Sequence, residues 1–121
     1  MNDLNALASR YIEMWNEPDA GKRRAIVREL FAPGAVHYTP TREFHGLERM
    51  DVRVAEGYEQ FVKPGVNIFR PVAGANGHHG AARFQWEMVE VATGRVTGRG
   101  SDFLLMGEDG RILSDHQFVG R

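Results

Sequence analysis

The stretch Phe84–Met88, with the sequence FQWEM, alternates large apolar side chains with polar ones. Because successive residues of a strand face opposite sides of a sheet, this alternation predicts a strand with one buried and one exposed face. Extended runs continue from Val66 onward and are separated by turn residues at 73–77, 92–94 and 107–110. Sequential strands joined by short turns predict an antiparallel meander over the second half of the chain.

The run Phe103–Met106, with the sequence FLLM, is apolar on both faces and predicts a part of the sheet that is covered twice. Gly98 and Gly100 lie a few residues before this run, within the same predicted strand. Glycine inside a strand often marks a bulge, so we expect these two positions to curve the sheet.

The first half of the chain has the three-and-four spacing of amphipathic helices, interrupted by proline and glycine. We expect helices over Leu4–Trp15, Lys22–Phe31 and about Leu47–Val62, with an extended stretch at Ala35–Thr39 and a polar loop to Gly46. Helices first and strands afterwards predict an α+β fold with the helices packed on one face of the sheet.

The chain has 121 residues, 42% of them hydrophobic, which suits one core and one domain over residues 1–121. The net charge of -1 is spread evenly, so no basic stripe predicts a nucleic-acid partner. The sequence has no cysteine, no signal-peptide pattern at its start and no apolar run near the roughly 20 residues that span a bilayer. We therefore expect a cytoplasmic protein with no membrane partner.

The order of these elements and several local strings resemble the nuclear transport factor two-like (SnoaL-like) superfamily. This superfamily includes polyketide cyclases, ketosteroid isomerases, limonene epoxide hydrolases and scytalone dehydratases. The strings closest to ketosteroid isomerases are Arg10–Glu13, Phe31–Pro40, His45–Gly46, Pro71–Phe84 and Ser101–Ile112. The resemblance implies a cone-shaped roll whose curved, mainly antiparallel sheet wraps a helix around a pocket for a small, largely apolar molecule. Function varies so widely among these proteins that the fold alone does not give the chemistry.

Dimerisation through the sheet is common in this superfamily, and the sequence agrees with it. Phe103 and Leu105 would lie on the convex face of the sheet, where they would otherwise form exposed apolar surface. We expect a homodimer that buries this face.

Asp102 most needs an explanation, because a carboxylate is costly to bury unpaired and this one lies inside an apolar strand. By resemblance it would be the protonated carboxyl that donates to an enolate oxygen in ketosteroid isomerases. Tyr11 matches the tyrosine that acts beside it, and two such donors would stabilise an oxyanion. Alternatively, Asp102 pairs with an arginine or a bulge amide, and Tyr11 is a core aromatic residue.

Two positions depart from the family pattern. Thr39 stands where the isomerases carry an aspartate as general base, and a hydroxyl cannot serve as that base at neutral pH. Gln117 stands where SnoaL-type cyclases carry an aspartate. His37 shares a strand face with Thr39 and could accept a proton near neutral pH, or it could only stabilise the strand.

Asp115 is the remaining candidate base, and its orientation depends on the connection before it. An even number of loop residues in the Glu108–Gly110 connection would place Asp115 and Gln117 on the face of Asp102, whereas a three-residue loop would place His116 there. We expect the first arrangement. Two neighbouring carboxylates would repel, so one would hold its proton and the pair would supply an acid and a base. Otherwise, Asp115 is exposed and paired with an arginine.

The ligand-binding wall is predicted from Trp15, Thr39, Phe84, Trp86, Met88 and Gln117. We expect no metal, because His78 and His79 have no third ligand at a recognisable spacing. We also expect no cofactor, since Gly74, Gly77 and Gly80 do not open a helix as a phosphate-binding loop would. Three functions remain: a proton-transfer enzyme that uses Asp102, Tyr11 and either His37 or Asp115, a non-catalytic binding module, and a structural dimer with a filled cavity.

Overall fold

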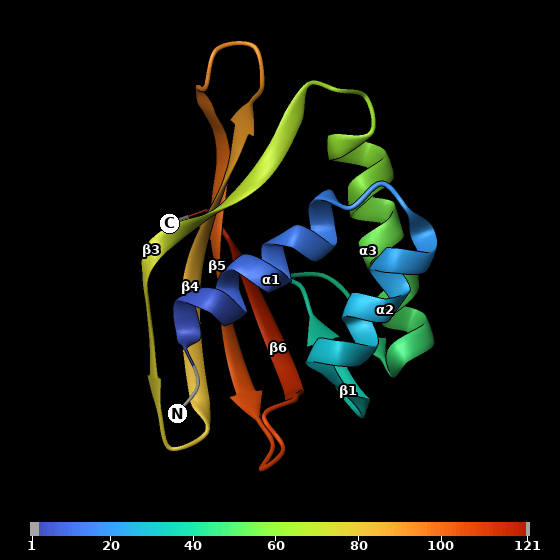
Figure 1. The fold of residues 1–121 in the computed structure, drawn as a ribbon, viewed down its shortest axis with the longest axis vertical. Coiled ribbons are helices and arrows are strands. Elements are labelled where there is room, and N and C mark those ends of the chain that lie inside the picture. Colours follow the sequence, from blue (N-terminus) through green and yellow to red (C-terminus); the bar gives the residue numbers. More distant parts are fainter. Residues whose placement is uncertain (1–2, 121) are drawn as a thin grey trace.

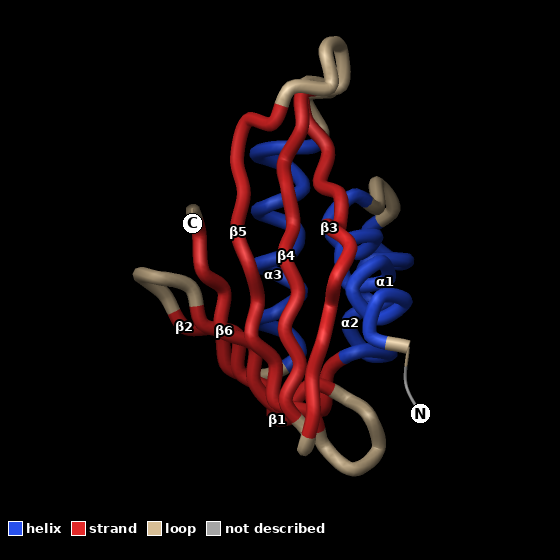
Figure 2. The backbone as a smooth tube through the Cα atoms, turned by 90° about the vertical axis from the view of Figure 1, so that its left-hand side faces the viewer, coloured by secondary structure: helices blue, strands red, loops and turns tan. Residues whose placement is uncertain are grey.

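The computed structural model describes residues 3–120 as three helices packed on one face of a six-stranded sheet. The strand order is β2-β1-β6-β5-β4-β3, and all described neighbours are antiparallel except β1 and β6. The strands are β1 Phe31–Tyr38, β2 Glu43–His45, β3 Asn67–His78, β4 Ala81–Glu90, β5 Val96–Met106 and β6 Ile112–Val119. Figures 1 and 2 show the curved sheet with the helices to one side of it. The predicted α+β roll is confirmed.

The helices are α1 Leu4–Asn16, α2 Ala20–Leu30 and α3 Leu47–Gly57, and a π-helical segment η1, Tyr58–Val62, continues α3. The side chains of Asp3 and Asp19 accept hydrogen bonds from backbone N–H groups in the first turns of α1 and α2. These caps satisfy amides that a helix leaves unpaired at its start. Within residues 3–120, no helix combines the length and the apolar character that a membrane crossing requires.

The predicted end of the second helix is wrong, because Phe31 begins β1 instead of ending α2. The side chain of Phe31 is buried and packs near the ring of Tyr11. Phe31 fits both the helical spacing before it and the strand that follows, and pairing with Ile112 of β6 decides in favour of the strand. The polar loop predicted up to Gly46 is also interrupted, by the short strand β2.

The turn predicted at 73–77 is wrong as well, because β3 continues through it to His78. The glycine that suggested a turn has another role. Gly74 adopts a positive φ of 105° where the register between β3 and β4 shifts. Glycine accepts this backbone conformation without strain, so the residues that resemble a turn form an irregularity within a long strand. The hairpin turns instead at His79 and Gly80.

The connection between β5 and β6 is a three-residue loop, so the expected even loop is wrong. The backbone N–H of Gly107 donates to the carbonyl of Arg111 at 2.8 Å and closes the loop over 108–110. By itself this loop would turn His116 toward the face of Asp102.

A bulge at the start of β6 restores the expected orientation. Met106 pairs with Ile112, but the next pair along the ladder skips Leu113. This extra residue moves every later residue of β6 to the opposite face. Asp115 and Gln117 therefore face inward, as predicted, although for a different reason.

The outer face of the sheet carries apolar side chains, as the sequence predicts. Phe103 is 39% exposed and Leu105 is 44% exposed, whereas Leu104 between them is fully buried against the helices. The homodimer expected through this face stays a prediction.

Candidate functional site

Tyr11 lies at the centre of a buried polar cluster between α1 and the sheet. Its ring packs edge-on against Phe84 at a centroid distance of 5.0 Å, and the residue is 1% exposed. Its hydroxyl oxygen lies 3.0 Å from Oδ2 of Asp102 and 2.6 Å from Oδ2 of Asp115. The structure thus brings together three of the four predicted catalytic residues.

The two contacts of the Tyr11 hydroxyl assign the protons. A hydroxyl has one hydrogen and can donate to only one carboxyl oxygen, so the other contact needs a proton from a carboxyl group. The shorter contact is to Asp115, which therefore accepts as a carboxylate. Asp102 then carries a proton and donates it to the phenolic oxygen.

The surroundings of the two carboxyl groups agree with this assignment. Burial raises the pKa of Asp102 well above its usual value, and the charge of nearby Asp115 raises it further. Burial raises the pKa of Asp115 too, but hydrogen bonds from its neighbours oppose that effect. Burial also raises the pKa of Tyr11, so the phenol keeps its proton at neutral pH.

His37, the fourth predicted catalytic residue, completes the cluster from β1. It pairs with Asp115 in the β1–β6 register, and its Nδ1 lies 2.8 Å from Oδ2 of Asp115. Burial lowers the pKa of His37 to about 4, so the ring is neutral at pH 7 and donates its Nδ1 hydrogen to the carboxylate. Its other nitrogen, Nε2, is left as an acceptor facing Arg53 at 3.5 Å.

Trp86 holds Asp102 from the neighbouring strand. The indole Nε1–H donates to Oδ1 of Asp102 at 2.9 Å, which leaves Oδ2 for the contact with Tyr11. The indole lies across Gly100, the residue that pairs with Trp86 on β5. A Cβ at Gly100 would collide with the indole ring and with the carbonyl oxygen of Phe118. Gly100 is thus needed for close approach and not for the bulge predicted there, whereas the register does shift beside Gly98.

A cavity of about 420 Å³ lies beside this cluster, between the helices and the inner face of the sheet. Five predicted residues line it: Tyr11, Trp15, Trp86, Met88 and Gln117. Its other lining residues are Ile12, Arg53, Gly57, Gln60, Phe61, Phe69, Thr97, Gly98, Arg99 and Val119. The volume falls within the range of small-molecule sites, and the wall is mainly apolar with a few polar groups. In a structural dimer we would expect Trp15, Trp86 and Met88 to fill this space, but they line it instead.

Two residues predicted to bind ligand lie outside this lining. Thr39 is at the end of β1, where its Oγ1 accepts from the backbone N–H of Arg42 at 2.9 Å and stabilises a turn. Phe84 is 4% exposed and packs in the core against Tyr11. The sequence places both residues on inward-facing positions, but it does not show how far along the strand the cavity extends.

The buried acids also do not line the cavity directly. Among residues 3–120, the cavity lining includes no aspartate, glutamate or histidine. Asp102, Asp115 and His37 lie behind the wall and are at most 1% exposed. Tyr11 is the titratable residue that both lines the cavity and contacts the two carboxyl groups.

Arg53 is the main residue that sequence reasoning missed. It projects from α3 into the wall, and its Nη2 donates to Oε1 of Gln117 at 2.8 Å. Its guanidinium lies 5.1 Å from the ring of Trp15, within the range of a cation–π contact. A signal exists in the sequence, because Arg53 follows Met50 by three residues and so falls on the apolar stripe of the helix.

The cluster could in principle offer ligands to a metal ion. His37, Asp102 and Asp115 each have one candidate ligand atom, and these atoms lie within 4.8 Å of one another. Oδ2 of Asp115 already accepts from Tyr11 and His37, whereas its Oδ1 is buried without a hydrogen-bond partner. Hydrogen bonds thus account for the position of Oδ2 but leave Oδ1 unpaired.

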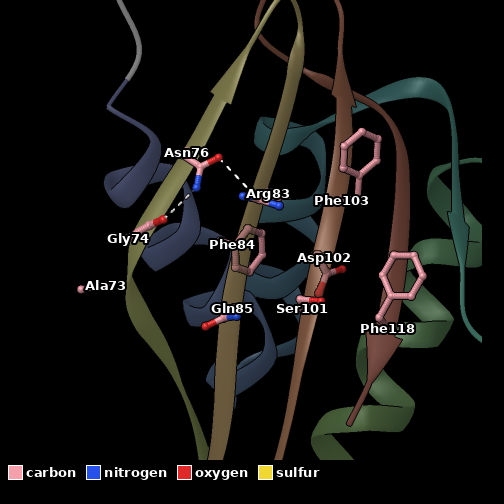
Figure 3. A pocket seen from close by; sticks show the side chains of 10 residues that line it. All are labelled: Ala73, Gly74, Asn76, Arg83, Phe84, Gln85, Ser101, Asp102, Phe103 and Phe118. Atoms are coloured by element: carbon pink, nitrogen blue, oxygen red, sulfur yellow. Dashed lines mark hydrogen bonds between the residues drawn. The ribbon is translucent and has the colours of Figure 1, made fainter. Parts of the chain in front are cut away.

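A second hollow, of about 550 Å³, lies on the opposite face of the sheet. Figure 3 shows this face, with Gln85, Ser101 and Phe118 on adjacent strands and the helices behind them. Asp102 also lines this hollow, but its side chain is buried and bonds inward to Trp86.

The assigned proton on Asp102 can be tested by NMR. We expect the side-chain ¹³C resonance of one aspartate to remain that of a protonated carboxyl at pH 7 and to disappear in Asp102→Asn. Because the asparagine amide can still donate to Tyr11 and accept from Trp86, this variant should lose less than about 1 kcal/mol of stability. A carboxyl at Asp102 that ionises near the ordinary value of about 3.9 would contradict the assignment.

The sequence of the chain matches that of a known domain family. Residues 8–114, nearly the whole chain, match the SnoaL-like domain. The chain belongs to the SnoaL-like domain family. The predicted superfamily is therefore confirmed. A search of curated protein sequences found no match.

Solved structures resemble this SnoaL-like domain over most or all of their length. A SnoaL-like family protein from Agrobacterium tumefaciens str. C58, proposed to be an isomerase, has a TM-score of 0.88 at 22% identity, with 100% of each chain covered. A SnoaL-like protein of unknown function from Burkholderia thailandensis E264 has a TM-score of 0.72 at 13% identity, covering 98% of this chain and 95% of the other. A protein from Sinorhizobium meliloti, proposed to be a polyketide cyclase, has a TM-score of 0.64 at 15% identity, with 89% of each chain covered. Identities this low show a shared fold and leave the chemistry to the site.

Proposed function

We propose that this SnoaL-like domain binds a small, largely apolar molecule in the inner cavity and transfers a proton in isomerase- or cyclase-type chemistry. One observation carries the proposal: Tyr11 lines the cavity while its hydroxyl contacts carboxyl oxygens of both Asp102 and Asp115. A group of this kind can both give and take a proton. The reactions proposed for the Agrobacterium and Sinorhizobium proteins belong to the same class.

As an acid, Tyr11 would act on a carbonyl oxygen of the bound molecule. The oxygen would compete with Asp115 for the hydroxyl hydrogen, while Asp102 continues to donate to the phenolic oxygen. Hydrogen bonds in such a chain polarise one another, which makes the phenol a stronger donor to an oxygen that gains negative charge.

As a base, Tyr11 would relay a proton to Asp115. The phenolic oxygen takes the proton of an acidic C–H group while its own proton passes to Asp115 across 2.6 Å. The C–H bond breaks, an O–H bond forms on Asp115, and the electron pair remains on the substrate as an enolate. His37 supports the carboxylate that receives the proton.

A non-catalytic binding module is the second candidate, and one observation favours it. Within the described part of the chain, no carboxylate or imidazole lines the cavity, so any base would act only through Tyr11. Such a protein would bind the same molecules without converting them.

Deuterium exchange distinguishes these two functions. Apolar cyclic ketones such as 2-tetralone are incubated with the protein in D₂O, and loss of the α-hydrogen signal is followed by ¹H NMR. We expect exchange above the buffer rate, reduced at least about 100-fold in Tyr11→Phe, since general acid–base groups contribute about 10²–10⁴-fold. Quenching of Trp15 and Trp86 fluorescence reports binding in the same samples.

The matched control is Tyr58→Phe, which removes a hydroxyl from η1, outside the cavity lining. This variant should retain the full exchange rate. Ketone binding without exchange would favour the binding module, and equal exchange in Tyr11→Phe would remove Tyr11 from the chemistry.

A further inference from the structure

Arg53 is a partly buried cation whose polar partners are neutral. Its Nη2 donates to Oε1 of Gln117, and its Nε lies 3.5 Å from Nε2 of the neutral His37 ring. No carboxylate of residues 3–120 forms a salt bridge with it. By contrast, Arg28 and Arg42 each bind a carboxylate of α3 through both terminal nitrogens.

The buried charge of Asp115 does not serve as a direct partner for Arg53. It lies on the other side of the His37 ring, and its Oδ2 already accepts from Tyr11 and from His37. Nη1 of Arg53 makes no hydrogen bond with any residue from 3 to 120. Burial disfavours a charge that lacks such partners, so an anion beside this nitrogen would be favourable.

The rest of the cavity wall has the same polarity. It includes a second arginine, Arg99, and no acidic side chain among the described residues. The indole N–H of Trp15 is buried without a hydrogen-bond acceptor. The wall is therefore rich in donors and positive charge, and elsewhere it is formed by apolar side chains such as those of Phe61 and Phe69.

We propose that the ligand of this cavity is an apolar molecule bearing a carboxylate or a similar planar anion, and that Arg53 binds this group. The inference rests on the binding part of the proposed function and names its substrate class. A guanidinium offers two parallel N–H groups that match the two oxygens of a carboxylate, and Arg53 presents this group at the wall of an otherwise apolar space. The apolar body of the ligand would then lie along the aromatic wall.

Two probes of nearly equal shape test the proposal: 2-naphthoate and its neutral methyl ester. Binding to the whole chain is measured by calorimetry and by tryptophan fluorescence. We expect the naphthoate to bind at least about tenfold more tightly than the ester, since charge-assisted hydrogen bonds are worth about 1.5–3 kcal/mol. Arg53→Gln should abolish this preference, and Arg53→Lys should retain part of it.

Arg49→Gln is the matched control, because it removes the same charge from an exposed position one turn earlier on α3, outside the cavity lining. This variant should keep the wild-type preference. Equal binding of the two probes to the wild type, a preference that survives Arg53→Gln, or binding of neutral ketones but not of the naphthoate would each overturn the proposal. If Arg53→Gln fails to fold, the wild-type ratio and Arg53→Lys decide. Deuterium exchange measures proton transfer through Tyr11 independently of anion binding by Arg53. Failure of either proposal therefore does not imply failure of the other.

Discussion

Replacement of Gly100 by alanine is expected to destabilise the protein by about 3 kcal/mol, the upper part of the usual range for overpacking. The added Cβ would collide with the carbonyl oxygen of Phe118 on β6 and with the indole of Trp86 on β4. The carbonyl belongs to the paired sheet and cannot move freely. The indole must therefore shift, which weakens its hydrogen bond to Asp102. Urea unfolding measures the stability, and the indole N–H resonance of Trp86 reports the hydrogen bond.

Gly34→Ala is the control for this substitution. Gly34 also lies in a strand, β1, but a Cβ there meets no atom within 4 Å. Its replacement should change stability by less than about 1 kcal/mol and can even stabilise the chain, since alanine restricts the unfolded state. If Gly100→Ala were as stable as the wild type, with an unshifted indole resonance, the close packing of Trp86 on β5 would be contradicted.

Acidification is expected to destabilise the protein through His37. The pKa of His37 is about 4 in the folded protein against an ordinary value of 6.5, so the unfolded chain binds the proton more readily. The stability due to the neutral ring is fully present above pH 6.5 and is lost as the pH falls toward 4. The slope is about 1.4 kcal/mol per pH unit, which amounts to about 3 kcal/mol over this window.

The acid cluster acts in the opposite direction, so a variant is needed to isolate His37. The raised pKa of Asp102 means that the folded protein holds this proton more tightly, and its contribution to stability is lost as the pH rises. The contribution of Asp102 is common to the wild type and His37→Asn, because asparagine can still donate to Asp115 and keep the acid cluster in place. Subtracting the two free energies of unfolding therefore removes it. We expect this difference to shrink steadily from pH 6.5 to 4.

His45→Asn provides the control, because His45 lies on β2 with its side chain 65% exposed. Its substitution should leave the pH dependence unchanged. A difference between wild type and His37→Asn that is constant with pH would show that His37 titrates normally in the folded protein.

The sequence predicts the fold well because periodicity and turn residues reflect local geometry. The first helix is correct to within one residue, and the alternation around Trp86 identifies a strand with one buried face. The errors occur where the same residues suit two structures. Phe31 fits a helix and a strand, and the glycine-rich segment around Gly74 fits both a turn and an irregular strand.

The candidate site is harder to predict, because it depends on distances between segments far apart in the chain. The neighbouring positions of Tyr11 and Asp102 follow from the resemblance, whereas the inward position of Asp115 depends on a bulge in β6 that the sequence does not show. Thr39 lies outside the cavity because the sheet extends beyond the cavity at this end of β1, and the sequence does not show that extent. Arg53 was missed because a charge on an apolar helical stripe looks like a surface residue until the neighbouring wall is known.

The bulge at Leu113 makes the inward face of β6 depend on strand pairing as much as on composition. If Leu113 instead paired with Leu105, with no residue lost, every acid, base and aromatic group of the chain would be preserved, yet Ser114 and His116 would face the interior in place of Asp115 and Gln117. Deleting Leu113, which is 48% exposed, would remove the bulge but leave Asp115 opposite Leu104 and Gln117 opposite Asp102. When SnoaL-like domains are compared or redesigned, the presence or absence of a bulge in this strand therefore carries chemical information, and two chains with identical polar residues can have different sites.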